Sequence, residues 1–177
     1  MTTLRVPLGP EDHVRGSPNA RVTLVEYGDY QCPYCAAAQP VVGRLEALFG
    51  NGLRVAFRHF PLSEMHPLAG PAAETAEFAA ASGAFWTMHE ALFANQPLLS
   101  MRLLTRLSQQ LNLSEHELHA ALASALYTPK VKAHFLGGVR SGVNGTPTFF
   151  VDGVRFDLPP TFETLGLVIQ SRIAEQE

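Results

Sequence analysis

Cysteine is scarce in this sequence: two occur among 177 residues, Cys32 and Cys35, three positions apart. A disulfide between such close neighbours closes too short a loop to constrain the chain, which excludes a framework of stabilising disulfides. The alternative, half of a zinc site, lacks its remaining ligands, because no second cysteine pair or closely spaced cysteine and histidine is present. We expect no metal, and the spacing of the pair favours redox chemistry.

Three other features are missing. Lys and Arg form no cluster, and the net charge is −3, so the electrostatic footprint of a nucleic-acid-binding protein is lacking. The longest apolar stretches, such as 68–84, contain Glu74 and Glu77 and fall short of the roughly 20 apolar residues of a membrane-spanning helix. No glycine-rich phosphate loop or dinucleotide fingerprint occurs. We therefore expect no cofactor, no nucleic acid and no membrane as a partner.

The first ten residues also lack the apolar core and cleavage site of a secretory signal. Taken as written, the sequence predicts a cytoplasmic protein. If the chain is a mature fragment whose signal has been removed, it is periplasmic or secreted. No dimerisation segment is recognisable, and a monomer is the simplest expectation.

What is present is an alternation of strand and helix patterns after an irregular lead-in that extends to about residue 20. Short β-branched and aromatic runs predict strands, and apolar residues at helical spacing predict helices. Ser114, followed by Glu117, predicts a helix start with a capping box. The expected strands are 22–27, 53–60, 148–151 and 154–156, and the expected helices are 32–49, several short ones within 68–143, and 161–175.

This order is β-α-β, a helical insertion, then β-β-α. A βαβ unit gives a parallel pair of strands, and the Asp152-Gly153 turn gives an antiparallel hairpin. We expect an α/β protein with a central mixed sheet, forming one domain over 1–177 with a helical insertion at 63–143.

The motif Cys32-Pro33-Tyr34-Cys35 follows the first core strand and opens a helix. Unpaired N–H groups and the positive end of the helix dipole favour a thiolate there, so Cys32 is expected to be the nucleophile with a lowered pKa. Cys35, one turn further on, can resolve a mixed disulfide. Pro33 fits the first turn, where its missing N–H would have had no partner.

Other candidates for chemistry are weaker. His116 and His119 are interpreted as solvated surface residues, whereas His59 and His66 flank a strand end and are the histidines to watch. Four aromatic residues are expected in the core of the insertion, namely Phe78, Phe85, Trp86 and Phe93.

Four segments resemble the bacterial DsbA-like branch of the thioredoxin superfamily. They are VTLVEYGDYQCPYC at 22–35, FRHFPL at 57–62, the helical stretch from HPLA at 66–69 to FWTMH at 85–89, and VNGTPTFFV at 143–151. The resemblance implies a thioredoxin-like fold with a helical insertion. It also implies a thiol-disulfide oxidoreductase that acts on protein thiols and disulfides or glutathione and is recycled by a redox partner that the sequence does not identify.

The same resemblance implies that the Thr146–Pro147 bond is cis and that this loop faces the cysteines, where its backbone pairs with an extended substrate. Thr146, Pro147, Pro33 and Tyr34 are the implied substrate contacts. From the residues alone, an ordinary trans turn proline remains open at Pro147.

Glu26 is a charged residue on an otherwise apolar strand, six positions before Cys32. A carboxyl group buried there would have a raised pKa and could relay a proton to or from Cys35. The resemblance, which places an acid at this position, favours that role over a glutamate that reaches solvent.

The direction of electron flow is left open by the motif. The strongly oxidising DsbA has Pro-His between its cysteines, and the neutral Tyr34 here predicts a reduction potential between about −270 and −120 mV, the values of thioredoxin and DsbA. Two alternatives remain: a kappa-type glutathione transferase or isomerase, and a peptide-binding module without redox turnover on the same fold.

Overall fold

The computed structural model describes residues 2–175, so Met1 and the last two residues of the expected domain 1–177 lie outside the described part. Its centre is one five-stranded mixed sheet in the order β1-β3-β2-β4-β5. The strands are β1 His13–Gly16, β2 Val22–Gly28, β3 Leu53–His59, β4 Thr148–Val151 and β5 Val154–Phe156. The α/β class and the mixed sheet expected from the sequence are confirmed.

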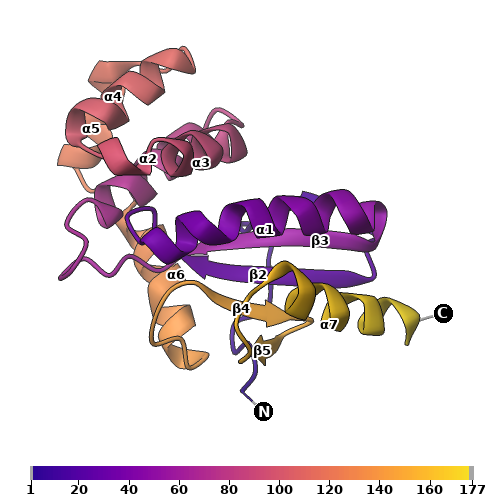
Figure 1. Ribbon diagram of the computed structural model, residues 1–177. Helices are drawn as coiled ribbons and strands as arrows, with labels where there is room; N and C mark the ends of the chain where they lie inside the picture. The colour runs from indigo at the N-terminus through magenta and orange to yellow at the C-terminus, as the bar shows by residue number, and fades with distance from the viewer. Residues whose placement is uncertain (1, 176–177) are drawn as a thin grey trace.

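Within residues 2–175 the sheet is accompanied by seven α-helices, some packed on its faces and others grouped at one end (Figure 1). They are α1 Pro33–Phe49, α2 Ala69–Ala80, α3 Phe85–Ala94, α4 Met101–Gln110, α5 Glu115–Ala123, α6 Thr128–Arg140 and α7 Phe162–Ala174. Short 3₁₀ turns, η1 Gly50–Gly52 and η2 Gln96–Leu98, follow α1 and α3. In the sequence, five of these helices, α2 to α6, therefore lie between β3 and β4.

The βαβ unit β2-α1-β3 forms the expected parallel pair, in register from Val22 opposite Leu53 to Gly28 opposite His59. On the other side of β2, β4 runs antiparallel and forms the predicted hairpin with β5. The turn residues Asp152 and Gly153 both have positive φ, 47° and 77°, as a two-residue hairpin of this sequence requires.

The expectation that the chain is irregular up to about residue 20 is wrong in one part. Residues 13–16 form the strand β1, which pairs antiparallel with β3. Asp12, just before it, accepts two hydrogen bonds from the buried Arg58 of β3, from Nε at 2.7 Å and from Nη2 at 2.8 Å. The carbonyls of Val6 and Pro7 accept from the same guanidinium. Residues of the lead-in thus supply the hydrogen-bond acceptors that stabilise the buried guanidinium of Arg58.

Two layers of helices cover the sheet. On one face, α1 and α7 bury Leu24 of β2 with Leu45 and Leu165. On the other face lies α6, where a Cβ on Gly138 would meet the Phe60 ring at 2.7 Å. Although α6 belongs in sequence to the helical insertion, it packs as the second layer of the sheet.

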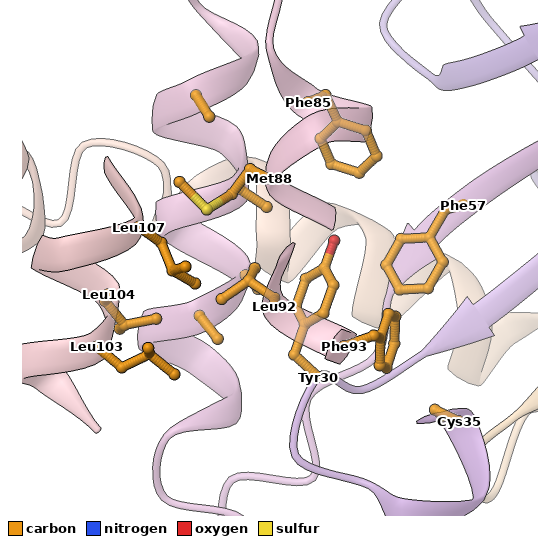
Figure 2. Close-up of a cluster of buried hydrophobic side chains, with 14 of the residues drawn as sticks. Tyr30, Cys35, Phe57, Phe85, Met88, Leu92, Phe93, Leu103, Leu104 and Leu107 are labelled. Carbon is orange, nitrogen blue, oxygen red and sulfur yellow. The ribbon is translucent and has the colours of Figure 1, made fainter. Parts of the chain in front are cut away.

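Helices α2 to α5 form a separate group at one end of the sheet (Figure 1). Figure 2 shows their core, with Met88 and Leu92 of α3 close to leucines of α4, and Tyr30 and Phe93 beside Phe57 of the sheet. Phe85 is buried there, as expected. The core contacts therefore continue from the insertion to the strand ends.

The predicted cap of α5 is present in part, since the Ser114 hydroxyl accepts from the Glu117 N–H. A reciprocal capping box is found instead at α7, between Thr161 and Thr164. The two helix starts expected near 115 and 161 are confirmed.

Candidate active site

The two cysteines occupy the start of α1, directly after the loop that leaves β2. Cys32 is the N-cap residue of the helix, Pro33 is its first residue, and Cys35 lies in the first turn. Both cysteines are free thiols in the structure. Cys32 is 4% exposed and Cys35 is fully buried, so only the first sulfur has any contact with solvent.

The pKa of Cys32 is lowered to about 5. The largest cause is a hydrogen bond from the Cys35 side chain, and the backbone N–H groups of Tyr34 and Cys35 lower the pKa further, against the opposing effect of desolvation. The Thr146 carbonyl oxygen lies 3.4 Å from Cys32 Sγ and accepts from it in the thiol form. At neutral pH the favoured form of Cys32 is therefore the thiolate, which is the nucleophilic form.

Cys35 has the opposite character. Burial raises its pKa well above the ordinary range, the hydrogen bond to Cys32 adds to the rise, and the charge of Glu26 adds further. The Asp29 N–H points at its sulfur, 3.4 Å away. Two chemically identical side chains thus differ in acidity because one caps the helix and the other faces the core.

Glu26 is 1% exposed, and its pKa is raised from the ordinary 4.5 to about 8, chiefly by burial. Hydrogen bonds from Gln39 and the charge of Arg15 oppose this rise. The carboxyl is therefore buried, as the sequence predicts. At pH 7 this carboxyl is mostly protonated, and a minor ionised fraction remains, so the group can both donate and accept a proton near Cys35.

Gln39 was not anticipated from the sequence, although it lies one helical turn after Cys35. Its Nε2 donates to both carboxylate oxygens of Glu26, at 3.2 and 3.3 Å, and to the Cys35 carbonyl at 3.3 Å. Its Oε1 lies 3.0 Å from His89 Nε2, and His89 Nδ1 lies 3.0 Å from the Tyr30 hydroxyl. His89, from the insertion, carries no sequence pattern that would have revealed it.

The loop before β4 faces the cysteines, and its Thr146–Pro147 bond is cis. Beside it lies a cavity of about 460 Å³, whose lining is Tyr34, Ala37, Ala38, Thr146, Pro147 and Pro160. Tyr34 is 74% exposed. The structure therefore brings Tyr34, Thr146 and Pro147 together around an apolar hollow, while Pro33 is exposed and is not part of its lining.

Asp29 anchors the loop that follows β3. Its carboxylate accepts from the Leu62 N–H at 2.9 Å and pairs with His66 Nδ1 at 2.8 Å. Since the Asp29 N–H also points at Cys35, one residue connects the second cysteine to this loop. His66 is thereby placed near the site, as its position at the strand end suggested.

His59 belongs to a different group, in which Glu77 Oε1 lies 2.7 Å from both His13 Nε2 and His59 Nε2. Three such ligand atoms could hold a metal ion, a possibility that the sequence spacing concealed. However, the Lys130 ammonium already lies 2.9 Å from Glu77 Oε2. A cation of the chain's own thus compensates the buried carboxylate. His116 and His119 are exposed on α5.

Comparison with known proteins agrees with this geometry. The family model described as Thioredoxin matches residues 9–171. Among solved structures, BdbD from Bacillus subtilis in its oxidised form has a TM-score of 0.83 at 21% identity, covering 92% of this chain and 93% of that one. The α-DsbA1 of Wolbachia pipientis also has a TM-score of 0.83, at 20% identity, covering 97% and 95%.

A thioredoxin-like oxidoreductase from Silicibacter pomeroyi is 26% identical with a TM-score of 0.77, over 96% of this chain and 95% of that one. The curated relatives carry a different name. A Na(+)/H(+) antiporter, NhaA 3 of Salinispora tropica, is 41% identical over 172 residues, which is 97% of this chain and 26% of the relative. The NhaA of Herminiimonas arsenicoxydans is 39% identical over 86% of this chain and 24% of its own length.

The chain thus spans about a quarter of the length of these relatives. No helix within residues 2–175 is long and apolar enough to cross a membrane. The match over 9–171 and the structural neighbours agree on the fold. This chain belongs to the thioredoxin family, and it has the DsbA-like form of the fold, in which a block of helices separates the two halves of the sheet.

Proposed function

We propose that this chain is a thiol-disulfide oxidoreductase that exchanges disulfides with protein substrates through Cys32 and Cys35. The observation that carries the proposal is the difference between the two sulfurs: the pKa of Cys32 is lowered to about 5, while that of the buried Cys35 is raised. A nucleophile ready as thiolate, backed by a resolving thiol that stays protonated, is the arrangement that such exchange requires.

In the reducing direction, the Cys32 thiolate attacks a substrate disulfide, one substrate sulfur leaves as a thiolate, and a mixed disulfide forms. Cys35 then gives its proton to the Glu26 carboxylate and attacks Cys32 Sγ. The bond between Cys32 and the substrate breaks, and the second substrate sulfur leaves with the electron pair. The product is the Cys32–Cys35 disulfide, and a dithiol partner must reduce it before the next cycle. Oxidation of a substrate dithiol is the same sequence in reverse.

Thr146 and Pro147 serve in this proposal as the place where an extended substrate segment pairs with the backbone. Support comes from the position of the loop beside Cys32 Sγ and from the apolar cavity that adjoins it. Tyr34, exposed at the rim, offers an aromatic contact to the same segment. Pro33 contributes by starting the helix that presents Cys32.

The antiporter names of the relatives raise a second question, since this chain matches only about a quarter of each. We infer that the matching quarter is a redox domain of the same kind. Ion exchange would then belong to the remaining length of those proteins. Support comes from the identity of 41% over 172 residues together with the thioredoxin fold of the chain that matches.

The experiment is a redox titration of the Cys32/Cys35 pair in glutathione buffers, followed by thiol alkylation and mass. We expect a single two-electron transition between the thioredoxin and DsbA potentials, about −270 and −120 mV. A potential near the reducing end would make the chain a reductase suited to a cytoplasmic setting, and one near the oxidising end a donor of disulfides suited to an oxidising compartment. Failure of the pair to form a disulfide in any buffer would overturn the proposal.

Two variants separate the alternatives. Cys32→Ser should reduce disulfide exchange with a model protein to the buffer blank, whereas Cys35→Ser should trap a mixed disulfide that mass spectrometry detects. Conjugation of glutathione to a model electrophile that survives Cys35→Ser would instead indicate a kappa-type transferase. Peptide binding unaffected by both variants, without turnover, would indicate a binding module.

A further inference from the structure

We propose that His89, in the helical insertion, is a positioning residue that holds the Gln39 amide in the orientation in which it donates to Glu26. The inference rests on the proposed function, in which Glu26 exchanges a proton with Cys35. It adds a residue from the insertion to the machinery that controls the second cysteine, although His89 itself touches neither cysteine through any hydrogen bond of the structure.

A chain of hydrogen bonds carries the argument. It runs from Tyr30 through His89 and Gln39 to Glu26, and each link is 3.0 to 3.3 Å long. Tyr30, His89 and Glu26 are buried. At such depth an unsatisfied polar atom is costly, so the direction of every link is determined by the donors and acceptors available.

The directions follow from the fixed end of the chain. The Cys35 carbonyl can only accept, so the Gln39 atom that faces it must be the amide nitrogen. Gln39 Oε1 is then the acceptor for His89, so His89 carries its proton on Nε2. His89 Nδ1 is left as an acceptor and receives the Tyr30 hydroxyl proton. Burial lowers the pKa of His89 and raises that of Tyr30, which keeps both neutral as this assignment requires.

This orientation matters to Glu26, because the amide nitrogen donates to both carboxylate oxygens. A donated hydrogen bond favours the charged form and opposes the burial that raises the pKa of Glu26. Were the amide reversed, its oxygen would face the carboxylate and favour the protonated form instead. By donating to Gln39 Oε1, His89 stabilises the orientation in which the amide nitrogen faces Glu26. His89 therefore influences how readily Glu26 takes the proton of Cys35.

Gln39 also stands at the border with solvent. It lines a cavity of about 400 Å³ together with Arg15, Glu90 and other residues, while Glu26 behind it is buried. Besides burial and the Gln39 hydrogen bonds, two charged groups act on Glu26: Arg15 lowers its pKa and Cys32 raises it. The pKa of His89 is lowered by the charges of three neighbouring groups, Arg15, His59 and His13.

The test is a carboxyl ¹³C NMR titration of Glu26 in the reduced protein. We expect Gln39→Leu to raise the pKa of Glu26 by about one unit, and His89→Phe by about half a unit, since a hydrogen bond to a charged group is worth about that much. In the double variant the His89 change should add nothing to the Gln39 change, because it acts through Gln39. The pH profile of mixed-disulfide resolution should shift upward with the same ranking.

His119→Phe is the matched control, since His119 is exposed on α5 and bonds to Thr105, and it should leave both readouts unchanged. If His89→Phe fails to fold, Tyr30→Phe keeps the aromatic core, frees the His89 tautomer and should shift Glu26 in the same direction. An unchanged pKa of Glu26 in His89→Phe, or in this substitute, overturns the inference. A wild-type Glu26 pKa near 4.5 would instead remove its relay role from the proposed function.

Discussion

Side chains at the amino ends and at the carboxyl ends of β2 and β3 point to the same face of the sheet, the face that α1 covers. The two sets of side chains differ in polarity. At the amino ends, Leu24 and Val55 pack against aliphatic side chains of α1 and α7. Two residues further along each strand, Glu26 and Phe57 pair in register. Phe57 belongs to the same buried cluster as Cys35, and the charge of Glu26 acts on that thiol. The period of two is preserved, but an apolar contact is replaced by a buried acid.

One sheet thus combines two roles at its two ends. The amino ends contribute stability through burial of aliphatic surface, about 25 cal/mol per Å². The carboxyl ends, which face the loops and the insertion, accept the cost of buried polar groups in return for control of proton positions. Changes at the two ends should therefore have separable effects.

The largest effect on stability is expected at the amino end. Leu24→Ala removes a fully buried side chain between β3, β4 and the helices, and should lower the free energy of unfolding by about 2–5 kcal/mol. Urea denaturation measures this loss. The thiolate absorbance of Cys32 should still titrate with an unchanged pKa, and a shift there would break the proposed separation between the two ends.

Glu26→Gln tests the carboxyl end. Because the pKa of Glu26 is about 8 in the folded protein against an ordinary 4.5, the folded state keeps a proton that the unfolded state has lost between these pH values. Unfolding thus releases a proton, and the stability of the wild type falls as pH rises through this window. Relative to Glu26→Gln, the wild type should lose about 3 kcal/mol between pH 4.5 and pH 7.

Thermal or urea unfolding at pH 4.5, 7 and 8 measures that difference. The same variant should slow resolution of the mixed disulfide while the fold is retained. Parallel stability curves for wild type and variant would show that Glu26 titrates normally, and unchanged exchange kinetics would remove its relay role.

Gly28→Ala adds a single methyl group at the last residue of β2. A Cβ at this position would meet the Phe57 ring at 2.5 Å and Glu26 Oε1 at 3.2 Å. We expect a loss of about 1–3 kcal/mol from overpacking, together with a changed pKa for Glu26. Gly43→Ala is the control, because nothing lies within 4 Å of a Cβ there, and equal effects from the two variants would contradict the argument.

Much of this arrangement was predictable from local patterns. The parallel pair β2 and β3, the hairpin at Asp152-Gly153 and the start of α1 at the cysteines all follow from periodicity and turn chemistry. Glu26 was recognisable because a charge on an apolar strand is conspicuous. These features depend on neighbours in sequence, which a single sequence displays.

Contacts between distant segments were not predictable in the same way. His89 reaches Gln39 from 50 residues away, and an amphipathic helix gives no indication of which polar residue turns inward. The strand β1 was missed because four residues, with two of them polar, carry too little pattern. A sequence signal for an ordered segment before β2 was Arg58, a charged residue on a predicted strand. Its side chain is buried and therefore requires a partner, which is Asp12, the residue before β1.

That partner gives the first residues of the chain a practical significance. A truncated protein that begins after Gly16 would lose the edge strand β1 together with Asp12 and the carbonyls of Val6 and Pro7, which accept hydrogen bonds from the Arg58 guanidinium. Removing one partner of a buried ion pair costs about 3–5 kcal/mol, a large share of the stability of an ordinary domain. Anyone designing a minimal fragment, or joining this domain to another protein, should therefore place the junction ahead of residue 6.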